Sequence, residues 1–214
     1  MSGFVIAVDG PAASGKGTVA QGLATLYGLP YLDTGLLYRA VGVSAQRQAG
    51  GVGEASATAA AQALDPALLD DPELRTRAAG ELASQAAVFT GVRAALLRFQ
   101  RDFAAQGSGA VLDGRDIGTI IAPEAPAKLF VTASPEVRAE RRWKQLSGQG
   151  ESVALADILA DIRLRDERDS GRAAAPLVKA DDAVLLDTSV LSIEQAADAA
   201  RRIVETARAN WAKA

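Results

Sequence analysis

The stretch 4–18, which reads FVIAVDGPAASGKGT, decides the fold. Its first five residues are apolar throughout and predict a buried strand. Gly10, Gly15 and Lys16 then match the pattern G-x-x-x-x-G-K, and the helical pattern that follows ends near Gly28. A strand, a glycine-rich turn and a helix in this order predict a phosphate-binding loop, because a chance lysine after a plain turn rarely has this context.

The chemistry of such a loop depends on its backbone and on one cation. Glycines let consecutive N–H groups face one concavity at the positive end of a helix, and Lys16 reaches the oxygens of a bound nucleotide. A hydroxyl residue usually follows the lysine, but here Gly17 intervenes before Thr18. We therefore expect Mg²⁺ to be held by phosphates and water near Thr18 and Asp33. The predicted nucleotide loop comprises Gly10, Pro11, Ala12, Ala13, Ser14, Gly15, Lys16, Gly17 and Thr18.

Apolar runs and helical patterns alternate beyond this loop. Short apolar segments at 4–8, 110–112, 128–132 and 183–186 predict buried strands, and 31–32 predicts a short extended piece. Helical stretches such as 34–48 separate them. Such strands predict an α/β fold with a five-stranded parallel sheet covered by helices on both faces. Ligands then bind at the carboxyl ends of the strands. A loop is expected at 147–152 (SGQGES), and Ser192 is expected to cap the last helix.

Composition excludes several kinds of chemistry. The 214 residues include no cysteine and no histidine, so disulfides, thiolate nucleophiles, Ser-His-Asp triads and zinc sites with Cys or His ligands are absent. Hydrophobic residues make up 49% of the chain, which is enough for an ordinary core. The formal charge of −3 argues against a nucleic-acid binder. We find no membrane or export segment and expect a cytoplasmic protein.

Arginine is much commoner than lysine, 18 against 5, and seven arginines crowd into the stretch 138–172. Guanidinium groups match the geometry of phosphate, so this stretch could hold a small polyanion. A solvated, salt-bridged helix face explains the pattern equally well on composition alone.

Three groups of polar residues stand where the predicted fold would place a ligand. Asp113-Gly114-Arg115-Asp116 ends a buried strand, and Asp33-Thr34-Gly35 follows another. Each also has a plain explanation, as a turn dipeptide and as a helix cap. Arg165, Asp169 and Arg172 share one face of a predicted helix, where surface ion pairing is the simple alternative.

Taken together, these blocks resemble bacterial cytidylate kinases. The resemblance covers nearly the whole chain in family order, except about 50–80, and rests on DGP (9–11), YLDTG (31–35) with Tyr38-Arg39, DGRDIGT (113–119), RDERD (165–169) with Arg172 and APL (175–177), and LDTS (186–189). The segment 50–80 shows no β-branched alternation and reads as short and helical, where family members carry a longer insert with a small sheet. The resemblance therefore does not extend to the insert at 50–80.

The resemblance implies a role for each matching residue. Asp116 would accept from the pyrimidine amino group, with Arg93 on the ring acceptors and Ser84 nearby; cytosine offers that donor beside those acceptors. Arg39 and Arg115, with Gly114, would hold the acceptor phosphate, and Asp33 and Thr34 would lie at the reaction centre. Arg165 and Arg168 would close on the transferring group, Asp169 would take the ribose hydroxyl and Arg172 would approach the base. The expected catalytic residues are Lys16, Asp33, Arg115, Arg165 and Arg168.

We therefore predict one nucleoside monophosphate kinase domain, with a core of about 1–49, 81–147 and 177–214, an acceptor insert of about 50–80 and a lid of about 148–176. The expected reaction transfers the γ-phosphoryl group of ATP to CMP or dCMP, with Mg²⁺, in a monomer without nucleic-acid or membrane partners. A P-loop kinase for UMP, AMP or shikimate is the alternative. A non-catalytic nucleotide switch is a further one, although a switch needs no second phosphate site.

Overall fold

A computed structural model of the chain describes residues 3–148 and 150–213. Its five strands are β1 (Val5–Asp9), β2 (Tyr31–Asp33), β3 (Ala110–Gly114), β4 (Ala127–Thr132) and β5 (Val184–Asp187). They form one sheet in the order β2-β3-β1-β4-β5, and every neighbouring pair is parallel. The predicted five-stranded parallel sheet is confirmed.

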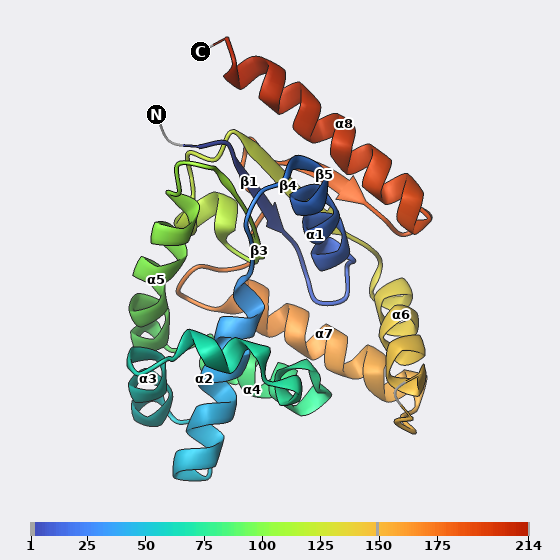
Figure 1. Ribbon diagram of the computed structural model, residues 1–214. Helices are drawn as coiled ribbons and strands as arrows, with labels where there is room; N and C mark the ends of the chain where they lie inside the picture. Colours follow the sequence, from blue (N-terminus) through green and yellow to red (C-terminus); the bar gives the residue numbers. More distant parts are fainter. Residues whose placement is uncertain (1–2, 149, 214) are drawn as a thin grey trace.

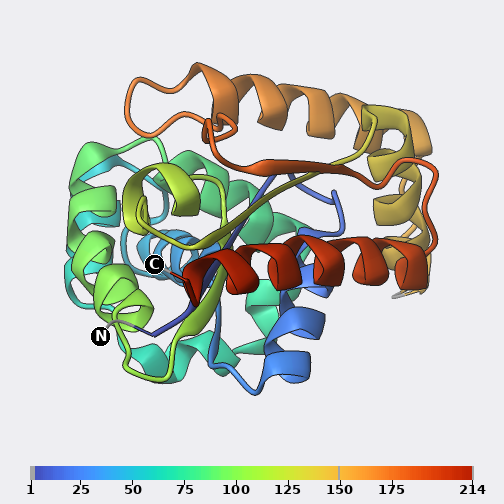
Figure 2. The ribbon, with the colours of Figure 1, turned by 90° about the horizontal axis from the view of Figure 1, so that it is seen from above.

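Eight α-helices are described: α1 (Lys16–Tyr27), α2 (Thr34–Ala49), α3 (Glu54–Gln62), α4 (Arg77–Ala86), α5 (Thr90–Ala104), α6 (Pro135–Gly148), α7 (Leu155–Gly171) and α8 (Ile193–Trp211). Short helical turns are η1 (Pro66–Asp70), η2 (Pro72–Arg75) and the π-helical η3 (Ile117–Ile121). Figure 1 shows α7 running beyond the carboxyl ends of the strands, between α4 and α6. Figure 2 shows the segment after α7 returning between α7 and α8 to reach β5.

Alternate residues of β1 build two cores on opposite faces of the sheet. Val5 and Ala7 pack with α2, α3 and α5. Ile6 and Val8 pack on the other face with α1 and α8. Because both faces are covered, a central strand of this sheet is apolar at every position before its polar end.

The helix boundaries follow local signals. Gly28 ends α1 in the left-handed conformation with φ +62°, and the Asp33 carboxylate accepts from the Gly35 N–H at 2.9 Å to begin α2. Ser192 begins α8 with a capping box. The segment 50–80 is helical, as expected, and packs against α2 through Leu74 and Ala79.

Three expectations about the elements were wrong. The run 183–186 was expected to be buried, but β5 lies at the sheet edge and leaves Val184 and Leu185 about half exposed. Helix α6 continues to Gly148 into the expected loop at 147–152, of which Gln149 lies outside the described residues. Arg172 does not share the helical face of Arg165, because α7 ends at Gly171 and Arg172 is extended, with ψ 141°. Among the helices of the described residues, none combines the length and the apolar character of a membrane span.

Candidate active site

The loop after β1 has the backbone shape of an anion-binding turn. Gly10 has φ +152°, and a Cβ there would stand 2.0 Å from the Val131 carbonyl oxygen, so only glycine fits. Gly15 has φ +87° and leads into the first residue of α1, Lys16. Ala13 also has a positive φ of +59°, an uncommon conformation for a residue with a side chain. This shape fits a phosphate group at the positive end of α1.

Ser14 contributes a hydroxyl to the loop, and its carbonyl fixes the loop to neighbouring side chains. The Ser14 hydroxyl is fully buried and finds no hydrogen-bond partner within the described part of the chain, so it could bond a ligand oxygen. The Ser14 carbonyl accepts from Thr188 Oγ1 at 3.0 Å and from Arg141 Nη1 at 3.4 Å. The side chains of Thr188 and Arg141 therefore hold the loop from below, and sequence reasoning assigned no role to either.

Two carboxylates face Lys16. Parallel register places Asp33 at the end of β2 beside Asp113 at the end of β3. Burial, with a contribution from Arg115, lowers the pKa of Lys16 to about 8, although both carboxylates act in the opposite direction. Burial also raises the pKa of Asp113 to about 7 against the effect of Lys16. Lys16, Asp33 and Asp113 thus form one group of charges at the carboxyl ends of β2 and β3.

Asp113 belongs to the motif DGRDIGT (113–119), but the sequence analysis assigned it no role. Its Oδ1 accepts from the Tyr31 hydroxyl at 3.4 Å, and its Oδ2 stands 3.4 Å from where a Cβ on Gly17 would lie. The Asp113 carboxylate therefore lies directly beside the loop at Gly17. The alignment of the polar ends of neighbouring strands was the signal that could have indicated Asp113.

A pocket at the carboxyl ends of these strands is lined by every predicted substrate residue except Asp33 and Arg39. Its lining includes Thr34, Ser84, Arg93, Gly114, Arg115, Asp116, Arg165, Asp169 and Arg172, together with Tyr38. These residues come from α2, α4, α5 and α7, from the end of β3 and the two residues after it, and from the residue that follows α7. The fold therefore brings together side chains that are far apart in the sequence.

A buried ion pair lies in this pocket. Arg93 Nη2 donates to Asp116 Oδ2, with only 11% and 6% of the two side chains exposed. The Arg93 guanidinium also lies 5.5 Å from the centre of the Tyr38 ring. A carboxylate and a guanidinium are thus held side by side in a fixed geometry, one as acceptor and one as donor.

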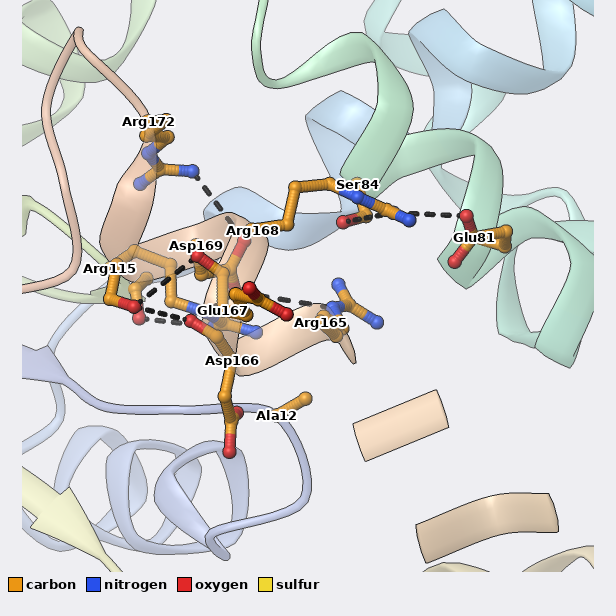
Figure 3. Close-up of polar contacts among 12 residues, drawn as sticks. Ala12, Glu81, Ser84, Arg115, Arg165, Asp166, Glu167, Arg168, Asp169 and Arg172 are labelled. Carbon is orange, nitrogen blue, oxygen red and sulfur yellow. Dashed lines mark hydrogen bonds and ion pairs between the residues drawn. The ribbon is translucent and has the colours of Figure 1, made fainter. Parts of the chain in front are cut away.

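Asp169 is the centre of a second charged cluster, drawn in Figure 3. It accepts from Arg115 Nε at 2.9 Å, with Arg172 Nη1 at 3.7 Å and Arg165 Nε at 4.0 Å. Burial alone would raise the pKa of Asp169, but the surrounding arginines outweigh it and lower the pKa. Burial and Arg115 lower the pKa of Arg165 to about 10. This cluster has more cations than anions, which suits a phosphate ligand.

Arg168 turns away from that cluster. Its Nη1 donates to the Ser84 hydroxyl and to Glu81, each at 2.9 Å, so it joins α7 to α4 (Figure 3). The structure thus places Arg165 among the residues that line the pocket and the guanidinium of Arg168 against α4.

A larger cleft of about 910 Å³ connects the loop to this region. Ala12 and Ala13 line it at one end, with Asp33, Arg39 and Arg165. Arg39 is anchored to the carbonyls of residues 74 and 76 at 2.7 and 3.1 Å. Arginines 75, 77 and 142 also line the cleft, and motif reading gave none of them a role. No cluster of three or more Asp or Glu side chains suited to a metal occurs within 3–148 and 150–213.

A P-loop that opens through an arginine-lined cleft onto a second anion pocket defines the class of P-loop kinases, because the two sites suit a phosphoryl donor and its acceptor. The family model described as cytidylate kinase matches residues 6–206, and the chain belongs to that family.

Relatives support this assignment. A cytidylate kinase of Caulobacter sp. (strain K31) is 68% identical over 209 residues, covering 97% of each chain. One of Xanthobacter autotrophicus is 66% identical over 206 residues, covering 96% of this chain and 99% of its own. An uncharacterised protein from Eubacterium ventriosum has a similar fold, with a TM-score of 0.57 at 15% identity, covering 94% of this chain and 98% of that one.

Proposed function

We propose that this protein transfers the γ-phosphoryl group of ATP to CMP or dCMP, giving ADP and CDP or dCDP. The observation that carries the proposal is the buried Arg93–Asp116 pair in a pocket that opens beside the P-loop. Family membership supports the same reaction. The phosphoryl acceptor is an ionised phosphate, so the absence of histidine is no obstacle: the reaction needs positioning and charge neutralisation more than a strong base.

The P-loop holds the donor. Its backbone N–H groups and the Ser14 hydroxyl bind the phosphates of ATP, and Lys16 contacts the oxygens that gain charge during transfer. Mg²⁺ would neutralise charge on the donor phosphates. Asp33 and Asp113 would orient the water molecules of that ion, with Thr18 close by, because Gly17 offers no hydroxyl.

Arginines position the acceptor phosphate. Arg39 lines the cleft, Arg115, which directly follows β3, lines the acceptor pocket, and Arg165 of α7 lines both. Three guanidinium groups around one phosphate hold the attacking oxygen in line with the γ-phosphorus and neutralise the developing charge. Closure of α7 over this point would exclude the water that otherwise hydrolyses ATP.

The pocket would recognise cytosine because its hydrogen-bonding groups complement those of the base. Cytosine presents an exocyclic amine, which donates to the Asp116 carboxylate, and ring acceptors, which take the N–H groups of Arg93. Uracil presents a carbonyl in place of that amine and would face Asp116 with two acceptors in contact. Asp169 then accepts from a ribose hydroxyl. Ser84 and Arg172 line the same pocket, and Arg168 donates to Ser84. These assignments disfavour UMP, AMP and shikimate as acceptors.

A panel of acceptors tests the proposal. ADP production from ATP and Mg²⁺ is followed with CMP, dCMP, UMP, AMP and shikimate, and with no acceptor. We expect the highest kcat/KM with CMP or dCMP and little turnover without an acceptor. ADP production that does not depend on the acceptor would refute the kinase assignment. AMP or shikimate as the best acceptor would refute the proposed recognition of cytosine by Arg93 and Asp116. The monomeric state and cytoplasmic location stay predictions.

A further inference from the structure

Helices α6 and α7 pack as a hairpin that also touches the P-loop. Ala139 and Leu146 of α6 meet Ile158 and Ile162 of α7 in a small core of their own, and Ala13 of the loop packs against it. The loop and the hairpin are therefore in direct contact, so a change in the conformation of the loop can alter the position of α6 and α7.

Arg138 is the polar link within that contact. Its side chain is 3% exposed, and each nitrogen of the guanidinium is used. Nε donates to the Ala133 carbonyl at 2.9 Å, and Nη1 donates to the Ala12 carbonyl of the P-loop at 3.2 Å. Nη1 and Nη2 together grip both oxygens of Asp166 on α7. A bidentate pair of this kind, with Arg138 buried and 28% of the Asp166 side chain exposed, fixes orientation as well as distance.

Asp166 stands at a sensitive place on α7. It directly follows Arg165 and precedes Asp169 by three residues, so its position sets how α7 turns these two side chains toward the acceptor pocket. Figure 3 shows Asp166 extending toward Ala12 while Asp169 extends toward Arg115. One helix thus contacts the donor loop on one side and the acceptor residues on the other.

We propose that Arg138, through Asp166, is a positioning residue that couples occupancy of the P-loop to the placement of Arg165 and Asp169. The proposal rests on the proposed function, since it concerns how ATP and CMP influence each other's binding. A donor phosphate that orders the 12–15 backbone also fixes the carbonyl of Ala12, hence Arg138, Asp166 and the face of α7. Binding of the donor therefore prepares the acceptor site.

A second ion pair between the same helices provides a matched control. Arg163 Nη2 lies 2.9 Å from Glu136 Oε1, but these side chains are 62% and 59% exposed and lie at the surface. Water and salt screen such a pair. If any bridge between α6 and α7 sufficed, Glu136→Gln would resemble Asp166→Asn.

The test measures how a non-hydrolysable ATP analogue changes the Kd of CMP by calorimetry. In the wild-type protein we expect the analogue to tighten CMP binding by about fivefold or more, and CMP to tighten the analogue by the same factor. In Asp166→Asn we expect this factor to fall to within about twofold of one, with kcat lowered. The unfolding midpoint should also fall, because the Arg138 guanidinium loses its counter-ion, so binding is measured at a temperature at which the variant is folded. Glu136→Gln should keep the wild-type factor.

Arg138→Lys keeps the positive charge but cannot make all four bonds, so it should also lose the coupling and provides a second variant if Asp166→Asn does not fold. A wild-type factor near one, an unchanged factor in a folded variant, or equal loss in Glu136→Gln would each overturn the coupling. These results leave the turnover of CMP by the wild-type protein intact, whereas failure of the proposed function would remove that turnover itself.

Discussion

Replacement of Asp116 by asparagine tests base reading with minimal change of shape. The Asp116 side chain is 6% exposed and lies against Arg93, which is 11% exposed and rests on the ring of Tyr38. Asn keeps one oxygen that can accept from a donor, but it loses the charge and gains an N–H₂ group that can donate. The substitution therefore removes the preference for a donor on the base.

The magnitude follows from one charged hydrogen bond in a buried pocket. A hydrogen bond to a charged group contributes about 1.5–3 kcal/mol. At about 1.4 kcal/mol for each factor of ten, kcat/KM for CMP should fall roughly 10- to 150-fold. UMP should lose little or improve, because the new amide can donate to the uracil carbonyl. The ratio of kcat/KM for CMP over UMP should thus fall by at least about tenfold.

The assay is initial-rate ADP production with each nucleotide, together with thermal unfolding to confirm that the variant is folded. Asp102→Asn is the control, because Asp102 forms an exposed ion pair with Arg98 on α5, the helix that carries Arg93. Its CMP-to-UMP ratio should equal that of the wild type. If folded Asp116→Asn keeps the wild-type ratio, Asp116 does not read the base and the reasoning fails.

Four further outcomes are expected. Lys16→Ala should lower kcat by at least about 10²–10³-fold in the ADP assay while the protein stays folded, because the main donor-side cation is lost. Gly10→Ala should lower the free energy of unfolding by about 3 kcal/mol or more in urea titrations, since its Cβ would meet the Val131 oxygen at 2.0 Å; an unchanged midpoint would contradict this. Because the pKa of Lys16 is lowered to about 8, kcat/KM for ATP should fall as pH rises through about 8, and Lys16→Arg should shift that limb upward; an identical limb would contradict it. The pKa of Asp113 is raised to about 7, so its stabilising contribution is full below the ordinary value of 3.8 and is lost as pH rises through about 7; Asp113→Asn should therefore gain stability over the wild type at pH 8 but not at pH 4.

The sheet and the loop could be predicted because their signals are local. Strand, glycine turn and lysine stand consecutively at 4–18, and the first helix ends where Gly28 supplies a positive φ. Resemblance supplied the rest of the acceptor set, and the structure gathers most of it in one pocket. The sequence therefore predicts which polar groups form the site and that they meet at the carboxyl ends of the strands.

Features that depend on tertiary neighbours could not be predicted. Val184 and Leu185 are exposed because β5 is an edge strand, and a run of apolar residues does not predict the order of strands in a sheet. Asp113 looks like part of a turn until register sets it beside Asp33. Arg138 looks like any surface arginine on a charged helix, and only its burial against the P-loop reveals a link between donor and acceptor sides.

The charges of this site are arranged for ligands that bring negative charge with them. Burial lowers the pKa of Lys16 to about 8 and that of Arg165 to about 10, and in both cases Arg115 adds to the effect. Like charges held together away from water destabilise the ligand-free protein. Phosphates remove that penalty, and they do so most fully when charge builds up between donor and acceptor. The cost of assembling the cations is thus met during folding, so that little reorganisation is left for the moment of transfer.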